Sequence, residues 1–345
     1  MWSCFRLPKD RVEEEEERHF LKNGGLLLEE MIKSFDGRPN PIRSFSQKEL
    51  QRATNNYHQD GFLHQHWSYQ MYKGTYEDRP IWVKKFPANA LWGYITELYI
   101  NEVAVASQMS KHKNVLKLLG CCLETQVPTL VYEFAANGRL SDHIYEDELS
   151  PSYLSWESRL RIATEIADAV AYLHNGTSKP IIHRAIKPQN IFLDQHNVAK
   201  LSEFGLSISI PLGETHVDVE VGQTPVDVEV VSGTYSFIAL ESALTLRYSE
   251  KSDVYSFGVV LFEILTGEMA TNIVWDVPDG METILRFFIE DNENEYLKTK
   301  IVRGNTEQLM ACAELALRCV KRNWEERPSM IEAAKELRRI TRFQR

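Results

Sequence analysis

One polar stretch between two apolar runs constrains this chain more than any other feature. Ile181 to Leu193 reads I-I-H-R-A-I-K-P-Q-N-I-F-L, and Leu201 to Gly205 reads L-S-E-F-G. A long amphipathic pattern precedes the stretch, with apolar residues on one helical face at Leu160, Ala163, Ala167, Val170 and Leu173. This order predicts a long helix over Trp156 to Leu173 that packs on the core and leads into a polar loop.

The polar stretch resembles the catalytic loop of eukaryotic protein kinases, H-R-D-x-K-x-x-N, which is followed by D-F-G. The resemblance implies that Lys187 and Asn190 keep their catalytic-loop positions, but Ala185 replaces the base and Glu203 replaces the metal-binding Asp. Loss of a positioned base typically lowers a rate by a factor of roughly 100 to 10,000. Glu203 moves its charge by a methylene, although Mg²⁺ demands tight octahedral geometry. We therefore expect no intact catalytic set, and at most a weak metal site at Asn190 and Glu203.

A second resemblance lies upstream, where Ile81 to Lys84 matches the V-A-I-K strand that carries the nucleotide-binding lysine. It implies that Lys84 pairs with Glu102 on a following helix; as an exposed ion pair this would add little stability and would mainly hold the helix against the sheet. Trp82 replaces a small Ala and would fill much of the adenine pocket, and Tyr132 would lie at the back of the cleft. These changes predict a vestigial site that binds ATP and Mg²⁺ weakly or not at all.

The glycine-rich loop of kinases is also altered. Its three glycine positions hold His64, His66 and Tyr69. Without glycine the backbone amides cannot approach nucleotide phosphates closely. We expect a β-hairpin with no phosphate-binding role.

The residues with a structural role in kinases are retained. The resemblance implies such roles for His183, Arg184, Phe204, Glu241, Asp253 and Arg327. Asp253 would hold the catalytic-loop backbone from a buried helix over Val254 to Leu265, and Glu241 would pair with Arg327. The implied fold is α+β and bilobal, with a kinase-like domain over residues 46–345, a small mostly β lobe over about 57–134 and a large mostly α lobe over about 138–345.

Residues 1–45 form an N-terminal extension. The five glutamates Glu13 to Glu17 predict a solvated, poorly ordered face. Apolar residues at helical spacing predict a short amphipathic helix over Leu26 to Phe35, with a stripe of Leu28, Met31, Ile32 and Phe35. This stripe packs either on its own lobe, which we favour, or on another protein. Asp36 to Arg43 is interpreted as a linker, and Ser46 to Glu49 as a capping box that opens a helix through Ala53.

The stretch from Leu206 to Ser232 carries five acidic side chains and no Lys or Arg. Valine and carboxylate alternate over Val217 to Val221 and again over Val226 to Val230, which favours a β-hairpin with one valine face; a disordered acidic loop is the alternative. We expect one of Asp218, Glu220, Asp227 or Glu229 to neutralise Arg184 and so to order the segment without phosphorylation. The ordered segment would present Thr215, Thr224 or the valine face to a partner kinase.

Bulk composition excludes several classes of function. The 345 residues carry a net charge of −10, which argues against nucleic-acid binding and against adhesion to an anionic membrane. No apolar run reaches membrane-spanning length. Five cysteines without disulfide-type spacing indicate reduced thiols in a cytosolic protein, with Cys312 and Cys319 in the core.

The chain as a whole resembles the plant receptor-like cytoplasmic pseudokinases related to HopZ-ETI-deficient. The resemblance rests on four features: an N-terminal helix that leads into P-I-R-S-F-S, a loop without glycine, the motif H-R-A and the motif S-E-F-G. The resemblance implies a cytoplasmic adaptor in plant immunity that reaches the plasma membrane through its partners. Those partners would be a coiled-coil NLR immune receptor and effector-modified receptor-like cytoplasmic kinases. The alternative is a slow serine/threonine kinase with residual ATP binding.

Overall fold

A computed structural model describes residues 9–35, 42–65, 69–86, 92–146, 150–219, 235–271, 281–282, 285 and 302–343. The chain forms two compact units. Unit 1 comprises residues 1–111 and 116–134, and unit 2 comprises residues 112–115 and 135–345. Among the described helices, none combines the length and apolarity needed to cross a lipid bilayer.

Unit 1 is built around a six-stranded sheet with the order β1-β5-β6-β4-β3-β2. Its elements are α1 (Lys9–Phe35), β1 (Arg43–Ser44), α2 (Gln47–Ala53), η1 (Gln59–Gly61), β2 (Phe62–Gln65), β3 (Gln70–Tyr76), β4 (Arg79–Lys85), α3 (Trp92–Met109), β5 (Leu118–Cys122) and β6 (Thr129–Glu133). The pair β1 and β5 is parallel and the other neighbours are antiparallel. The hairpin expected around His64 is confirmed, because β2 pairs with β3.

The two faces of strand β4 have different surroundings: one lies in the apolar core of unit 1, and the other carries predicted site residues. Ile81 and Val83 lie in an apolar cluster with Phe45 and with Leu50 of α2. Because successive side chains point to opposite faces of a strand, Trp82 and Lys84 lie on the other face. The capping box of Ser46 and Glu49 is present and starts α2 as predicted.

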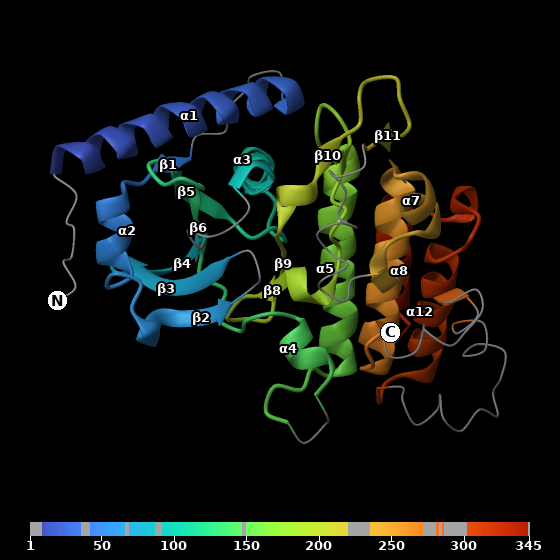
Figure 1. The fold of residues 1–345 in the computed structure, drawn as a ribbon. Coiled ribbons are helices and arrows are strands. Elements are labelled where there is room, and N and C mark those ends of the chain that lie inside the picture. Colours follow the sequence, from blue (N-terminus) through green and yellow to red (C-terminus); the bar gives the residue numbers. More distant parts are fainter. Residues whose placement is uncertain are drawn as a thin grey trace. The chain divides into compact units, whose positions relative to one another are not determined.

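Helix α1 corrects two predictions. It runs from Lys9 to Phe35, so the glutamate run is helical rather than poorly ordered, although most of it is exposed. The expected stripe is wrong at two positions: Leu28 and Ile32 are exposed, whereas Asn23 and Ser34 are buried. Met31 is half-buried, and the Phe35 side chain lies outside the described part of the chain. The helix packs on α3 of its own unit, as we favoured, but with a different face (Figure 1). The linker expected over Asp36 to Arg43 lies outside the described residues up to position 41.

Unit 2 is mainly helical, so the predicted α+β architecture is confirmed. Its elements are α4 (Ser141–Ile144), α5 (Trp156–Asn175), β7 (Ile181–Ile182), η2 (Pro188–Asn190), β8 (Ile191–Leu193), β9 (Ala199–Leu201), η3 (Phe204–Leu206), β10 (Ile208–Ser209), β11 (Val217–Asp218), η5 (Tyr235–Phe237), α7 (Leu240–Thr245), β12 (Arg247–Tyr248), α8 (Glu250–Thr266), α12 (Thr306–Cys319), η6 (Trp324–Glu326) and α13 (Met330–Ile340).

The core of unit 2 lies among its long helices. Helix α8 packs on α5 and α12, and α13 packs on α5 (Figure 1). The apolar face predicted for α5 is buried, and so are Cys312 and Cys319, where burial raises the pKa of each thiol to about 12. The buried Arg159 guanidinium donates to the carbonyls of Leu154, Ile264 and Ile144, so that one side chain ties three backbone segments together.

The close pairing of β1 with β5 gives a prediction about Gly120. A Cβ at this position would collide with the Arg43 carbonyl oxygen and would lie 2.7 Å from the Phe45 ring. We expect Gly120→Ala to displace β1 and to lower the free energy of unfolding by about 1–3 kcal/mol in urea denaturation.

Gly25→Ala is the matched control. A Cβ on Gly25 meets nothing within 4 Å, and alanine is the better helix former by about 1 kcal/mol. The control should therefore raise stability; an equal loss in both variants would contradict the role of the β1–β5 contact.

Candidate functional site

The predicted site residues fall in both units, and each set has its own geometry. In unit 1, Lys84 on β4 meets Glu102 on α3. The Lys84 Nζ lies 2.9 Å from each carboxylate oxygen of Glu102. The side chains are 0% and 2% exposed, so our expectation of an exposed ion pair is wrong. Removal of one partner from a buried pair strongly destabilises the fold, because the other charge is left buried and unpaired. Removal of one partner from an exposed pair has no such cost.

Aromatic side chains close around the ion pair. The Tyr132 hydroxyl donates to Glu102 Oε1 at 2.5 Å. The Lys84 ammonium lies 4.4 Å from the centre of the Tyr69 ring and 5.0 Å from that of the Tyr99 ring, which is cation–π distance. Tyr69 occupies the third glycine position of the kinase loop. The side chain that replaces a phosphate-binding glycine therefore covers the lysine that would otherwise contact phosphate.

Trp82 shares the Lys84 face of β4. Its indole is buried and meets the Phe134 ring edge-to-face, with centroids 5.8 Å apart. Backbone pairing places it between Lys73 of β3 and Tyr132 of β6. That the indole occupies the adenine volume stays a prediction. His64 lies on β2, and His66 lies outside the described residues.

In unit 2, the buried Asp253 carboxylate organises the loop that follows α5. It accepts hydrogen bonds from the backbone N–H groups of His183 at 2.8 Å and Arg184 at 2.9 Å, and it lies 2.8 Å from His174 Nε2. Arg184 has a left-handed backbone with φ +68°, a conformation that costs a residue with a Cβ about 1–2 kcal/mol. Asp253 holds the backbone in this strained conformation.

His183 links this loop to the segment around Phe204. Its Nδ1 accepts from the Ala185 N–H at 3.2 Å, so the ring proton lies on Nε2, which donates to the Ser202 carbonyl at 2.9 Å. Burial lowers the pKa of His183, which favours this neutral form. The ring meets Phe204 edge-to-face with centroids 5.0 Å apart.

Ala185 is buried and offers no side-chain acceptor. Its carbonyl accepts from Asn190 Nδ2 at 2.8 Å, and Ser202 donates to the Asn190 carbonyl through both its N–H and its hydroxyl. Asn190 thus uses its amide group to hold the loop. Lys187 is half-buried and directly precedes η2.

Glu203 also has a left-handed backbone, with φ +66° and ψ +59°. Among the described residues, no group of three His, Cys, Asp or Glu side chains is arranged to hold a metal ion. Lys84 is enclosed by Tyr69, and the Asn190 amide nitrogen is bonded to the loop backbone. Asn190 would therefore offer its amide oxygen, and not its nitrogen, to a metal ion.

Glu241 of α7, which is half-buried, and the buried Arg327 form a second contact in unit 2. The two guanidinium nitrogens of Arg327 lie 2.6 and 2.9 Å from the Glu241 carboxylate oxygens, a bidentate geometry. The same guanidinium donates to the carbonyls of Lys321 and Lys251. The pair therefore fixes α7 against the loop that precedes α13.

Only the first half of the predicted valine hairpin lies within the described residues after β10. Its first valine strand, β11, pairs with Arg247–Tyr248 of β12; Val226 to Val230 lie outside the described residues. Val217 and Val219 pack on a core of Ile182, Ile210 and Tyr248. Val217 and Val219 therefore face this core, and presentation of Thr215, Thr224 or the other valines to a partner stays a prediction.

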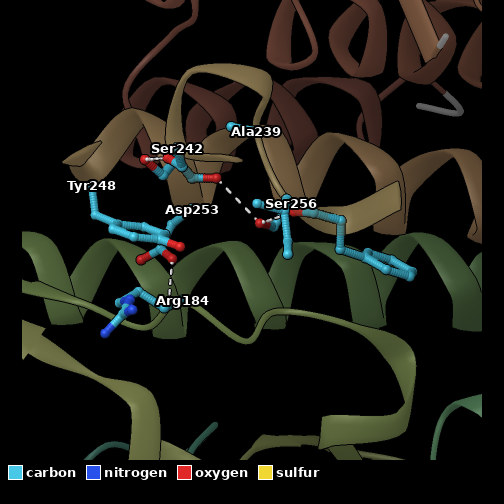
Figure 2. A pocket seen from close by; sticks show the side chains of 9 residues that line it. Arg184, Ala239, Ser242, Tyr248, Asp253 and Ser256 are labelled. Carbon is cyan, nitrogen blue, oxygen red and sulfur yellow. Dashed lines mark hydrogen bonds between the residues drawn. The ribbon is translucent and has the colours of Figure 1, made fainter. Parts of the chain in front are cut away.

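Asp218 does not neutralise Arg184. Its carboxylate accepts from Arg247 Nε at 2.9 Å. The Arg184 guanidinium donates to the Leu206 carbonyl at 3.1 Å and lies 4.2 Å from the centre of the Tyr248 ring. Figure 2 shows Arg184 below this ring and close to Asp253. Glu220, Asp227 and Glu229, the other expected partners, lie outside the described residues.

The buried pair in unit 1 gives a prediction. Lys84→Met or Glu102→Gln alone should lower the free energy of unfolding by about 3–5 kcal/mol, because each leaves its partner buried and unmatched. The double variant should lose much less than the sum, as measured in a urea-based double-mutant cycle.

Lys117→Met is the control for this cycle. Lys117 is exposed at the start of β5, so the change should stay within about 0.5 kcal/mol. If the double variant lost as much stability as the two single variants together, Lys84 and Glu102 would not depend on each other.

Comparisons with known proteins agree with this geometry. A family model described as protein tyrosine and serine/threonine kinase matches residues 64–337. Two relatives from Arabidopsis thaliana match almost end to end. The serine/threonine-protein kinase ZRK1 is 38% identical over 97% of this chain and 94% of its own length, and the non-functional pseudokinase ZED1 is 39% identical over 94% and 96%.

A third relative is longer. Wall-associated receptor kinase-like 1 of Arabidopsis thaliana is 39% identical over 98% of this chain, which spans 45% of that receptor kinase. The family match includes the strands around Lys84, the altered catalytic loop and the helices of unit 2. The chain therefore belongs to the protein tyrosine and serine/threonine kinase family, and within it to the plant HopZ-ETI-deficient-related kinases.

Proposed function

We propose that this chain is a catalytically impaired kinase that acts as a cytoplasmic adaptor in plant immune signalling. It would bridge a coiled-coil NLR receptor and effector-modified receptor-like cytoplasmic kinases. The observation that carries the proposal is the cover of Lys84 by the rings of Tyr69 and Tyr99 within unit 1, in addition to its ion pair with Glu102. The lysine serves the fold and is covered where a kinase would need it to reach a nucleotide.

The catalytic loop supports the same reading. Ala185 supplies no base, whereas Asp253 and His183 keep the loop backbone in place. The chain thus keeps the contacts that hold the catalytic loop but lacks the side chain that would act as the base. This combination is typical of a protein that binds partners and does not catalyse a reaction. The name of ZED1, a non-functional pseudokinase, supports this proposal.

An exposed apolar surface on α1 supports the proposal that the chain binds a partner protein. Leu21, Leu28 and Ile32 are 66%, 59% and 56% exposed. Their spacing of seven and four residues places them on one helical face, and exposed apolar faces of this kind commonly mark interaction sites. We assign this face to the receptor. The receptor class itself rests on the family resemblance, as does recruitment to the plasma membrane.

A slow serine/threonine kinase is the second candidate, in line with the name of ZRK1. It is favoured by Glu203, which keeps a charge at the metal-binding position. Such an enzyme would have to open the contacts of Tyr69 with Lys84, whereas Asn190 could offer its amide oxygen to a metal without breaking its bond to the Ala185 carbonyl.

A nucleotide titration separates the two candidates. We expect ATP with Mg²⁺ to leave the melting temperature unchanged at millimolar concentration, because Lys84 is covered. A ligand at about one hundred times its Kd would add roughly 2.7 kcal/mol of stability. Tyr69→Gly with Trp82→Ala is the matched variant and should gain a nucleotide-dependent shift. A shift in the unmodified chain, with phosphoryl transfer above a Lys84→Ala control, would establish the slow kinase instead.

A second experiment tests the receptor surface. Leu28→Asp with Ile32→Asp should weaken binding to a coiled-coil NLR co-expressed in leaf tissue by roughly thirtyfold or more, the effect of losing about 2 kcal/mol at an interface centre. Leu244→Asp, an equally exposed leucine on α7 of unit 2, is the control and should bind normally. Normal binding by the α1 variant would remove α1 from the interface.

A further inference from the structure

Helix α3, which carries Glu102, is buried over almost its whole circumference. The buried side chains between positions 96 and 109 are Thr96, Tyr99, Ile100, Glu102, Val103, Ala104, Val105, Ala106, Ser107 and Met109. A helix that packs on a sheet alone needs only one apolar stripe, whereas a helix buried all round needs cover on more than one side. The face of α3 that points away from the sheet must therefore meet another element.

The geometry of the helix identifies that face. Glu102 points toward the sheet, because it contacts Lys84 of β4. The opposite face of the helix carries Ile100, Ala104 and Ser107. These three residues are spaced four and three positions apart, so they share one face, and that face lies roughly opposite Glu102. Among the elements that the structure describes, α1 makes by far the larger contact with α3, and β5 of the sheet makes a smaller one. Figure 1 shows α1 crossing α3, which is seen nearly along its axis.

Asn23 anchors α1 in this position. Its side chain is buried in the middle of the helix, and its Nδ2 donates to the carbonyls of Leu123 at 3.0 Å and Thr125 at 2.8 Å. These carbonyls belong to the turn directly after β5. Asparagine is a poor helix former, so its position here is explained by the two carbonyls that it satisfies. The amide fixes the level at which α1 crosses the unit.

We propose that α1 is a built-in brace for α3, which keeps Glu102 on Lys84 without nucleotide and without a phosphorylated segment. The brace goes beyond the adaptor proposal, since it needs no partner. Asn23 acts as a positioning residue: it holds α1, α1 holds the outer face of α3, and α3 holds Glu102 against the ammonium of Lys84. Unit 1 thus supplies from its own N-terminal helix a restraint on α3.

Hydrogen–deuterium exchange of the full chain tests the brace. Asn23→Ala removes both hydrogen bonds and should speed exchange of the α3 amides by roughly tenfold or more, as expected for about 1 kcal/mol per lost bond. Exchange in α8 of unit 2 should not change. Leu27→Asp, one turn further along the same inner face, should act in the same direction. Lys22→Ala, the exposed neighbour of Asn23, is the matched control and should leave α3 unchanged.

Labelling of Lys84 with an acetyl-NHS ester, followed by mass spectrometry, provides the second readout. The Lys84 side chain, which reacts through its deprotonated amine, should be acetylated faster in Asn23→Ala than in the unmodified chain, by a factor similar to the change in α3 exchange. Unchanged α3 exchange and unchanged Lys84 labelling in both inner-face variants would overturn the brace. So would an equal rise in α8 exchange, because the effect would then be global unfolding. The double variant Leu28→Asp with Ile32→Asp separates the two proposals. If it loses receptor binding while amide exchange in α3 is unchanged, the result concerns the adaptor proposal and not the brace.

Discussion

The burial of one ion pair sets the arrangement of unit 1. Once Lys84 and Glu102 are removed from water, their mutual contact has to replace the lost hydration, and both carboxylate oxygens are used for this. The hydroxyl of Tyr132 and the ring of Tyr69 complete the surroundings. All of these contacts come from the chain itself. The side chain of Lys84 is thus fully buried among other side chains of unit 1.

Unit 2 depends in a similar way on Asp253. Its carboxylate receives two backbone N–H groups of the loop and so fixes Arg184 in a left-handed conformation. Glu203 shares this conformation, and such strain persists only where the surrounding contacts leave no alternative. The framework therefore does not rely on the side chain at position 185. This explains how Ala185 can occur in an otherwise well-ordered kinase loop.

The prediction of local elements succeeded where the pattern was long and repeated. The apolar face of α5 and the capping box of Ser46 and Glu49 follow from spacing alone. Exposure was harder to predict. The sequence pattern places Leu28 and Ile32 of α1 inside because apolar residues usually face the core, yet the inner face holds Asn23, whose amide nitrogen donates to two carbonyls. The second strand of the valine hairpin stays a prediction, while the first pairs with β12.

The sequence by itself determined the family, the order of the elements and the loss of the base at Ala185, because these depend on residue identity and local spacing. Only the tertiary structure decided that the Lys84–Glu102 pair is buried, that Tyr69 covers it and that α1 packs on α3. Those facts depend on which distant segments come together. Burial is a property of the surroundings of a side chain, and Tyr69, Tyr99 and Tyr132 reach the Lys84–Glu102 pair from separate parts of the fold.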